Sequence, residues 1–241
     1  MCDDAEARLA FLSARRDELL ARVADAASRA GRDASDVSAL AVSKTVDAAD
    51  VELAVRAGWD AFGENRPQEL VRKLRALGAS LPEPPRFDMI GNLQTNKVNQ
   101  VIGRVALIHS ISSLHLAQAV STRCEARGLT CDVLLEVNVS GERSKSGFSP
   151  EELREQCDLV LALGGIRVRG LMTMAPAHDP QAARRTFSGL RDVRDELRAR
   201  SGLALDLMSC GMSDDFEIAV EEGSNLLRLG RCVFDEGYHL R

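Results

Sequence analysis

The sequence has no long apolar run and no excess of positive charge. No stretch approaches the roughly 20 apolar residues of a membrane-spanning helix, and the acidic, amphipathic N-terminus lacks the apolar centre of a signal peptide. Lys and Arg total 31 against 36 Asp and Glu, a net charge of −5, so no overall positive field attracts nucleic acid or an anionic membrane. We therefore expect a cytoplasmic protein that binds neither nucleic acid nor membrane.

Paired metal-ligand motifs are also missing. The cysteines form no CxxC pair and have no histidine at metal-ligand spacing, and the four histidines show no ligand spacing among themselves. We expect no metal, and we expect reduced, mostly structural thiols at all six cysteines: Cys2, Cys124, Cys131, Cys157, Cys210 and Cys232.

What the sequence does contain is a regular alternation of β-rich and helix-like segments. Stretches such as "DAADVELAVRAG" and "SPEELREQCDLVLALG" separate the β-rich runs, and strand–helix repetition implies parallel pairing with crossovers. Eight units in 241 residues predict an α/β fold, a (β/α)8 TIM-type barrel in which residues 1–241 form a single domain. The β-rich runs are "VSALAVS", "DAFG", "FDMIG", "VALIHS", "DVLLEVNVS", "IRVRGLMTM", "LALDLMSC" and "NLLRLG".

Helix punctuation agrees with this periodicity. The predicted helices begin at Asp47, Ser112, Ser149 and Asp179, and several end at a glycine. The first 30 residues predict an extra N-terminal helix that packs on the barrel through one apolar face: Leu9, Leu12, Leu19, Val23 and Ala27.

Lys44 directly follows the first apolar run. The C-terminal ends of barrel strands form the active face, so Lys44 is expected at the mouth of the barrel. In a partly dry pocket a lysine loses its proton more readily, and the neutral amine attacks an aldehyde to form a Schiff base. An aldehyde substrate and pyridoxal 5′-phosphate (PLP) both suit such an amine, and a solvated loop lysine is the alternative.

The segments after the seventh and eighth runs have features of phosphate-binding loops. Barrels often bind phosphate there through backbone N–H groups and a helix N-terminus. "SCGMSDDFEIAVEEG" provides Gly211 for close backbone approach, the hydroxyl of Ser213 and two acids typical of a helix start, although this segment alone favours an ordinary capped helix. After the eighth run, Gly230 admits an anion to the backbone and Arg228 projects from the strand.

Six stretches across nearly the whole chain carry a family likeness: "LAVSKT", "FGENRPQEL", "FDMIGNLQTNK", "EVNVSGERSKSGF", "RGLMTM" and "SCGMSDDFEIAVEEGSNLLRLG". With them the sequence resembles the pyridoxal phosphate homeostasis protein family, PLP-binding proteins of the alanine-racemase N-terminal barrel type. The resemblance implies PLP held as a Schiff base on Lys44. It further implies a role in storing or delivering this cofactor, without established catalytic turnover.

The same resemblance implies the surroundings of the cofactor. Asn65 matches a residue beside the ring, Arg228 matches the arginine that faces the pyridine nitrogen, and Ser213 and Gly230 match phosphate contacts. A fixed positive charge disfavours a protonated pyridinium, so the ring becomes a weaker electron sink. That arrangement suits holding PLP better than transforming amino acids, but it does not decide between the two, because the racemases share the arginine.

The sequence departs from the family pattern at four places. Arg231 stands where Ser or Thr often adds a phosphate hydroxyl, and we expect its guanidinium to bind the phosphate instead. Val46 replaces a frequent second lysine, residues 88–89 (Asp-Met) replace a frequent His-Phe, and residues 235–236 (Asp-Glu) replace a common glycine.

Six further residues are weaker candidates. Lys145 is a candidate second amine for PLP transfer, although a structural or solvent-facing lysine is favoured. Lys97 is expected to begin a helix and is a less favoured candidate for anchoring an anion. Glu64 either accepts a hydrogen bond near the cofactor or caps a helix. His109 is a candidate acid–base group, and Met172 and Met174 are core residues that are candidates for contacting the cofactor.

Three functions are compatible with a strand-end lysine. The favoured one is a PLP carrier, a monomer or weak dimer that supplies PLP-dependent apoenzymes. A PLP-dependent amino-acid racemase or decarboxylase is the alternative, and a cofactor-free Schiff-base aldolase, which needs a nearby acid and base, is less favoured.

Racemases of this barrel type take a tyrosine from a second, β-rich domain. We expect no such domain within residues 1–241, and the single tyrosine, Tyr238, is expected to fray unless a partner or the barrel holds it.

Overall fold

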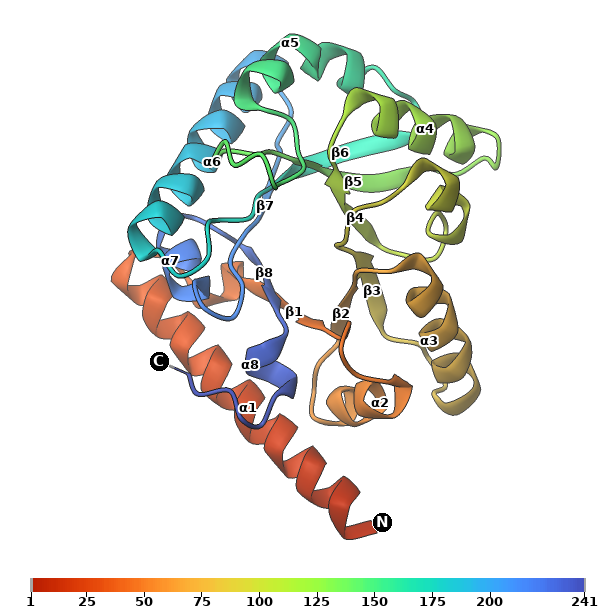
Figure 1. Ribbon diagram of the computed structural model, residues 1–241, viewed down its shortest axis with the longest axis vertical. Helices are drawn as coiled ribbons and strands as arrows, with labels where there is room; N and C mark the ends of the chain where they lie inside the picture. The colour runs from red at the N-terminus through yellow and green to blue at the C-terminus, as the bar shows by residue number, and fades with distance from the viewer. Residues whose placement is uncertain (1, 241) are drawn as a thin grey trace.

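The computed structural model describes residues 2–240, which contain a closed barrel of eight parallel strands. Each strand pairs with the next along the chain, and the last pairs with the first, so that Ala41 lies opposite both Phe62 and Leu229. Figure 1 shows the strands around the centre and the helices outside them. The strands are β1 (Ser38–Val42), β2 (Ala61–Glu64), β3 (Arg86–Met89), β4 (Leu107–Ile111), β5 (Cys131–Glu136), β6 (Ile166–Met172), β7 (Leu207–Ser209) and β8 (Leu226–Leu229).

Helices connect successive strands, which confirms the predicted TIM-type barrel with an extra N-terminal helix. The link between β3 and β4 is an exception, because it contains only a 3₁₀ helix. The single-domain assignment of residues 1–241 stays a prediction. The helices are α1 (Cys2–Arg29), η1 (Ala34–Asp36), α2 (Ala48–Arg56), α3 (Pro67–Ser80), η2 (Thr95–Gln100), α4 (Leu114–Glu125), α5 (Pro150–Leu161), α6 (Pro180–Ser201), α7 (Phe216–Glu221) and α8 (Arg231–Phe234).

Polar side chains cap several of these helices as the sequence predicts. Asp47 accepts backbone N–H groups at the start of α2, and Ser149 forms a reciprocal capping box with Glu152 at the start of α5. For α4 the predicted cap is wrong by one residue, since Ser113 and not Ser112 is the cap. The Ser113 hydroxyl accepts a hydrogen bond from the Leu116 N–H at 3.2 Å, as an N-cap side chain does.

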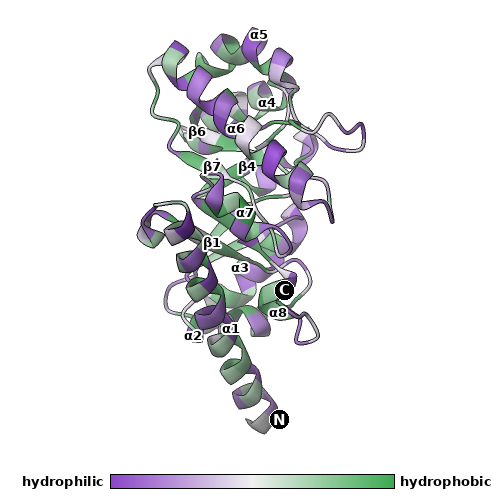
Figure 2. Ribbon diagram, turned by 90° about the vertical axis from the view of Figure 1, so that its left-hand side faces the viewer, coloured by the Kyte–Doolittle hydropathy of each residue, from purple (hydrophilic) through white to green (hydrophobic). Residues whose placement is uncertain are grey.

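Alternate residues of each strand face opposite sides of the barrel wall. On β1, Leu40 belongs to an apolar cluster that also contains Leu107, Leu134, Met172 and Leu226, whereas Ala41 packs in the larger layer between strands and helices. Figure 2 shows hydrophobic strands inside a more hydrophilic set of helices.

Helix α1 runs along the outside of the barrel beside α2, α7 and α8, and its N-terminal end extends beyond the barrel (Figure 1). The predicted apolar face packs inward: Leu12, Leu19, Val23 and Ala27 are buried and Leu9 is half-buried. Arg22 and Arg29 of α1 both pair with Glu217 of α7. Apolar packing and ion pairs together hold α1 against α2, α7 and α8.

No helix within residues 2–240 is long and apolar enough to cross a membrane. The cysteines at positions 124, 131, 157, 210 and 232 are free and buried, and the Cys124 and Cys131 sulfurs lie 3.3 Å apart. The expectation for Cys2 concerns a side chain outside the described part of the structure.

Candidate functional site

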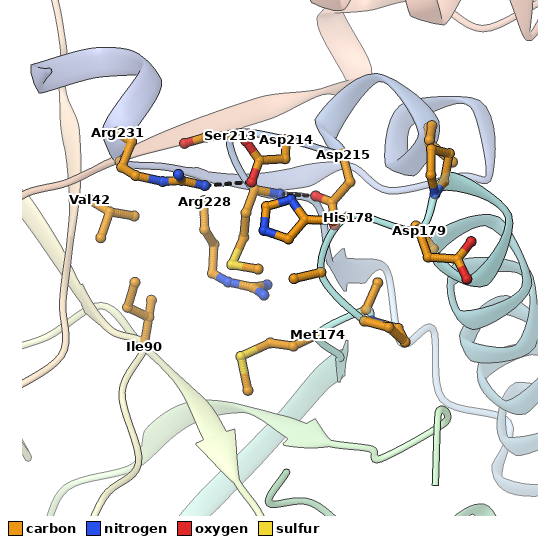
Figure 3. Close-up of a pocket in the computed structure, with 18 of the residues that line it drawn as sticks. Val42, Ile90, Met174, His178, Asp179, Ser213, Asp214, Asp215, Arg228 and Arg231 are labelled. Carbon is orange, nitrogen blue, oxygen red and sulfur yellow. Dashed lines mark hydrogen bonds and ion pairs between the residues drawn. The ribbon is translucent and has the colours of Figure 1, made fainter. Parts of the chain in front are cut away.

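A cavity of about 450 Å³ lies at the C-terminal ends of the strands. Its wall comes from the ends of β1, β2, β3, β6, β7 and β8 and the segments that follow them. Figure 3 shows side chains from several of these segments gathered around it. All six residues that the sequence predicts for the site line this one cavity: Lys44, Asn65, Ser213, Arg228, Gly230 and Arg231.

Lys44 follows the end of β1 and is exposed at the cavity. The preceding residue, Ser43, is buried, and its carbonyl oxygen accepts a hydrogen bond from Lys73 Nζ at 2.5 Å. The backbone before Lys44 is therefore anchored, while its own amine has no hydrogen bond or ion pair within residues 2–240. The exposure differs from the partly dry pocket that we expected, because the surrounding residues leave the amine open to water.

Asn65 follows β2, lines the cavity and carries an unpaired buried polar atom. Its side-chain oxygen is buried and has no hydrogen-bond partner among the described residues. A Cβ at Gly91 would lie 2.3 Å from the Asn65 carbonyl oxygen, so only glycine permits this close approach of the two loops. A buried polar atom left unpaired costs about 1–3 kcal/mol, which a polar ligand group offsets.

Arg228 projects from β8 and is 5% exposed. Its Nη1 donates to the carbonyl oxygen and the hydroxyl of Ser209 at 2.8 and 2.6 Å, and its Nη2 donates to the Thr173 carbonyl oxygen at 3.0 Å. Burial lowers the pKa of Arg228, and nearby groups including Asp215 and Glu136 partly offset this. A guanidinium has five N–H groups, so these three bonds leave Nε–H and one Nη2–H for a ligand.

Ser213 and Gly230 meet where the short helix α8 begins. The Cys232 N–H donates to the Ser213 hydroxyl at 3.2 Å, and Gly230 is the N-terminal cap residue of α8. The N–H groups of Val233 and Phe234 both donate to the Gly230 carbonyl oxygen, so neither is free for a ligand. An anion at this end of the cavity would therefore rely on the Ser213 hydroxyl and on the backbone at Gly230 and Arg231.

Arg231 makes contacts that the sequence analysis did not anticipate. Its Nη2 lies 2.5 Å from Asp214 Oδ2, and its guanidinium carbon lies 5.4 Å from the centre of the Tyr238 ring. The Tyr238 hydroxyl lies 2.8 Å from the Ser213 carbonyl oxygen and 2.6 Å from Asp214 Oδ1. The barrel therefore holds Tyr238, and the hydrogen bonds from Tyr238 and Arg231 lower the pKa of Asp214.

Gly211 and Asp215 have roles other than those expected from the sequence. Gly211 has a φ of 94°, and a Cβ there would lie 2.6 Å from the Ala219 Cβ of α7. Glycine is thus required by the backbone conformation and by packing of α7. Asp215 lies just before α7 but does not cap it; its carboxylate accepts the Met212 N–H at 2.6 Å, and burial raises its pKa.

The loop between β6 and α6 forms a wall of the cavity that the sequence analysis missed, apart from Met174. Residues 174–180 all line the cavity. His178 has a backbone φ of 61°, a value that residues other than glycine rarely adopt. Figure 3 shows the His178 ring on the side of the cavity that carries Asp215. The only sequence signal was the position of this loop after a barrel strand.

The remaining candidates lie outside the cavity wall. Lys145 Nζ donates to the Met174 carbonyl oxygen at 3.2 Å and pairs with Glu142 at 2.5 Å. Lys97 lies within the 3₁₀ helix η2, so the expected helix start there is wrong. Glu64 neither lines the cavity nor caps a helix; it is buried with Lys73, and the two side chains form an ion pair.

His109 is fully buried between Asp88 and Ser209, away from the cavity surface. Within residues 2–240, no three side chains of His, Cys, Asp or Glu are placed together to hold a metal ion.

Comparison with known proteins gives consistent matches over most of the chain. Residues 15–236 match the family described as alanine racemase, N-terminal domain. The pyridoxal phosphate homeostasis protein of Aquifex aeolicus is 40% identical over 223 residues, 92% of this chain and 96% of that protein. The protein of the same name from Pseudomonas aeruginosa is 41% identical over 218 residues, with coverages of 90% and 92%. The structure of PipY from Synechococcus elongatus PCC7942 with PLP bound is 31% identical with a TM-score of 0.78, covering 88% of this chain and 99% of PipY.

Proposed function

We propose that this chain, which belongs to the pyridoxal phosphate homeostasis protein family, binds PLP through Lys44 and serves as an intracellular carrier of that cofactor. One observation carries the proposal. A single cavity is lined by Lys44 and Asn65, whose amine and buried amide oxygen have no partner within residues 2–240, and by a buried arginine with N–H groups left for a ligand. The relative PipY, of similar structure, has been solved with PLP bound.

The cavity residues fit the parts of PLP. When bound, PLP supplies a reactive aldehyde and an aromatic ring that withdraws electrons. Lys44 provides the amine for the aldehyde, and the free N–H groups of Arg228 suit an unprotonated ring nitrogen. The turn of Ser213 and Gly230 suits the phosphate, and Arg231 adds charge when it turns away from Asp214.

We further propose that the protein holds PLP without catalytic turnover. An arginine beside the ring nitrogen would disfavour the protonated ring that carbanion chemistry uses, but racemases of this barrel type share that feature, so the proposal rests on the missing second proton-transfer group. Racemisation also needs a second proton-transfer group on the opposite face of the substrate. Tyr238 is poorly suited to this role, because it does not line the cavity and burial together with its bond to Asp214 raises its pKa.

The partners follow from a carrier role. We propose that apoenzymes which require PLP receive it from this protein, and that the protein is a monomer or weak dimer. The cavity mouth supports transfer, since Lys44 is exposed there and PLP can leave without the barrel opening.

An absorbance titration tests the proposed function. The full-length protein mixed with PLP is expected to develop a visible band that borohydride bleaches. Lys44→Ala should lose the band and keep at most weak binding through the phosphate turn. Lys145→Ala is the matched control, because it removes a nearby amine that does not line the cavity. An undiminished band in Lys44→Ala would reject Lys44 as the attachment point.

A further inference from the structure

A row of hydrogen-bonded side chains crosses the barrel interior behind the cavity. Arg86, the first residue of β3, contacts both carboxylate oxygens of Asp88 at 3.1 and 3.0 Å. Asp88 Oδ2 lies 3.1 Å from His109 Nε2, and His109 Nδ1 lies 3.0 Å from the Ser209 hydroxyl. That hydroxyl is 2.6 Å from Arg228 Nη1. The row thus runs from the N-terminal end of the barrel to an arginine in the cavity wall.

The middle of this row is closed to water. Asp88, His109 and Ser209 each have 0% exposure, and Arg228 has 5%. Burial lowers the pKa of His109, which favours the neutral ring, although the bond to Asp88 opposes this. A buried polar group must find its partners within the protein.

For a neutral His109 ring, hydrogen-bond chemistry allows one arrangement of protons along the row. A carboxylate only accepts hydrogen bonds, so His109 Nε2 carries the proton toward Asp88. The Nδ1 atom of the neutral ring must then accept, and the Ser209 hydroxyl donates to it. Ser209 in turn accepts from Arg228, which can only donate. From Arg228 to Asp88 each donor therefore points away from the cavity, and Arg86 donates to Asp88 from the opposite end of the row.

We propose that Asp88, His109 and Ser209 are positioning residues that fix the guanidinium of Arg228, so that its free N–H groups meet an acceptor on the ligand ring. This inference rests on the proposed function. This hydrogen-bonded row, called the relay below, also connects Arg228 to His109. An acceptor bound at Arg228 polarises the guanidinium, and the relay transmits that change to the His109 ring. None of the three residues lines the cavity.

Nitrogen NMR of the full-length chain labelled at histidine tests the relay. The sequence has four histidines, so the ring signals are separable by substitution. In the unloaded protein, His109 should be neutral with its proton on Nε2. Loading with PLP, verified by the visible band, should shift the His109 Nδ1 signal. Ser209→Ala should abolish this shift and weaken PLP binding about 3- to 10-fold, the effect of one lost hydrogen bond.

Ser121→Ala is the matched control. Ser121 is also a buried serine, and its hydroxyl both donates to Glu125 and accepts from the Gly165 N–H, far from the cavity. It should leave the His109 signal and PLP binding unchanged. Asp88→Asn gives a second test in the same spectra. The new amide accepts from Arg86 with its oxygen and turns its NH₂ toward His109 Nε2, so the His109 ring proton should move to Nδ1.

Two results would overturn the relay. One is a His109 ring that carries its proton on Nδ1 or on both nitrogens in the unloaded wild-type protein. The other is a PLP-induced shift that persists in Ser209→Ala. A protein that shows no visible band with PLP contradicts the proposed function instead, and the unloaded spectra then still decide on the proton arrangement.

Discussion

The hydroxyl of Tyr238 lies 2.6 Å from the carboxylate of Asp214, and this contact closes the C-terminal tail over the Ser213 loop. The same carboxylate binds Arg231, whose side chain is 57% exposed. Arg15 of α1 donates to the Tyr238 carbonyl oxygen at 3.0 Å, so the tail is also tied to the N-terminal helix. One acidic residue thus controls where Arg231 points.

Arg231→Ala should weaken PLP binding by about 1.5–3 kcal/mol, the range for hydrogen bonds to charged groups. The exposed ion pair with Asp214 is worth only about 1 kcal/mol or less, so Arg231 is able to leave it for a phosphate. A fluorescence titration measures the affinity. Asp214→Asn is the control and should leave binding unchanged or tighter. If Arg231→Ala binds PLP as the wild type does, backbone groups alone hold the phosphate.

Lys73→Met should lower the free energy of unfolding by about 3–5 kcal/mol, because it leaves the buried carboxylate of Glu64 without its cationic partner. The double variant Lys73→Met/Glu64→Gln should recover a large part of that loss. Urea denaturation of the three proteins measures the difference. A loss below about 1 kcal/mol in the single variant would show that water reaches the pair.

Stability should fall on mild acidification because of His109. Burial lowers its pKa in the folded protein, so below about pH 6.5 the unfolded chain binds a proton that the folded chain does not. The free energy of unfolding then decreases as the pH drops from that value to the folded pKa. His109→Gln should flatten this slope in urea denaturation, whereas His239→Gln should keep it. An equal slope in both variants contradicts a buried neutral His109.

The PLP-loaded protein should not exchange the Cα proton of alanine faster than free PLP does. Proton exchange needs an acid and a base on opposite faces of the substrate, and Tyr238 is committed to Asp214 and Ser213. Exchange in deuterated buffer, followed by proton NMR, measures the rate. Rapid exchange that Lys44→Ala abolishes would support the racemase alternative.

The barrel and the predicted residues that line the cavity could both be inferred from the sequence. Strand–helix alternation predicts the eight strands, and residues at strand ends converge by topology, which is why Lys44 and Arg228 line the same cavity. Contacts between side chains far apart in the chain could not be predicted. Asp88, His109 and Ser209 show no spacing pattern, since their meeting depends on strand register inside the barrel.

Local patterns also fail where tertiary contacts decide the outcome. Tyr238 near the chain end looks free to fray, yet its hydroxyl and carbonyl oxygen are both bound. Glu64 resembles a site or capping residue, and only the structure shows that Lys73 from α3 reaches it. Lys97 lies where the other links have an α-helix, but this link forms a 3₁₀ helix.

Mapping the attachment site tests the central claim most directly. The wild-type protein is loaded with PLP, reduced with borohydride, digested and analysed by mass spectrometry. The account predicts one modified peptide, with the reduced pyridoxyl group on Lys44. Modification on Lys145 or spread over several surface lysines, with Lys44 unmodified, would contradict it.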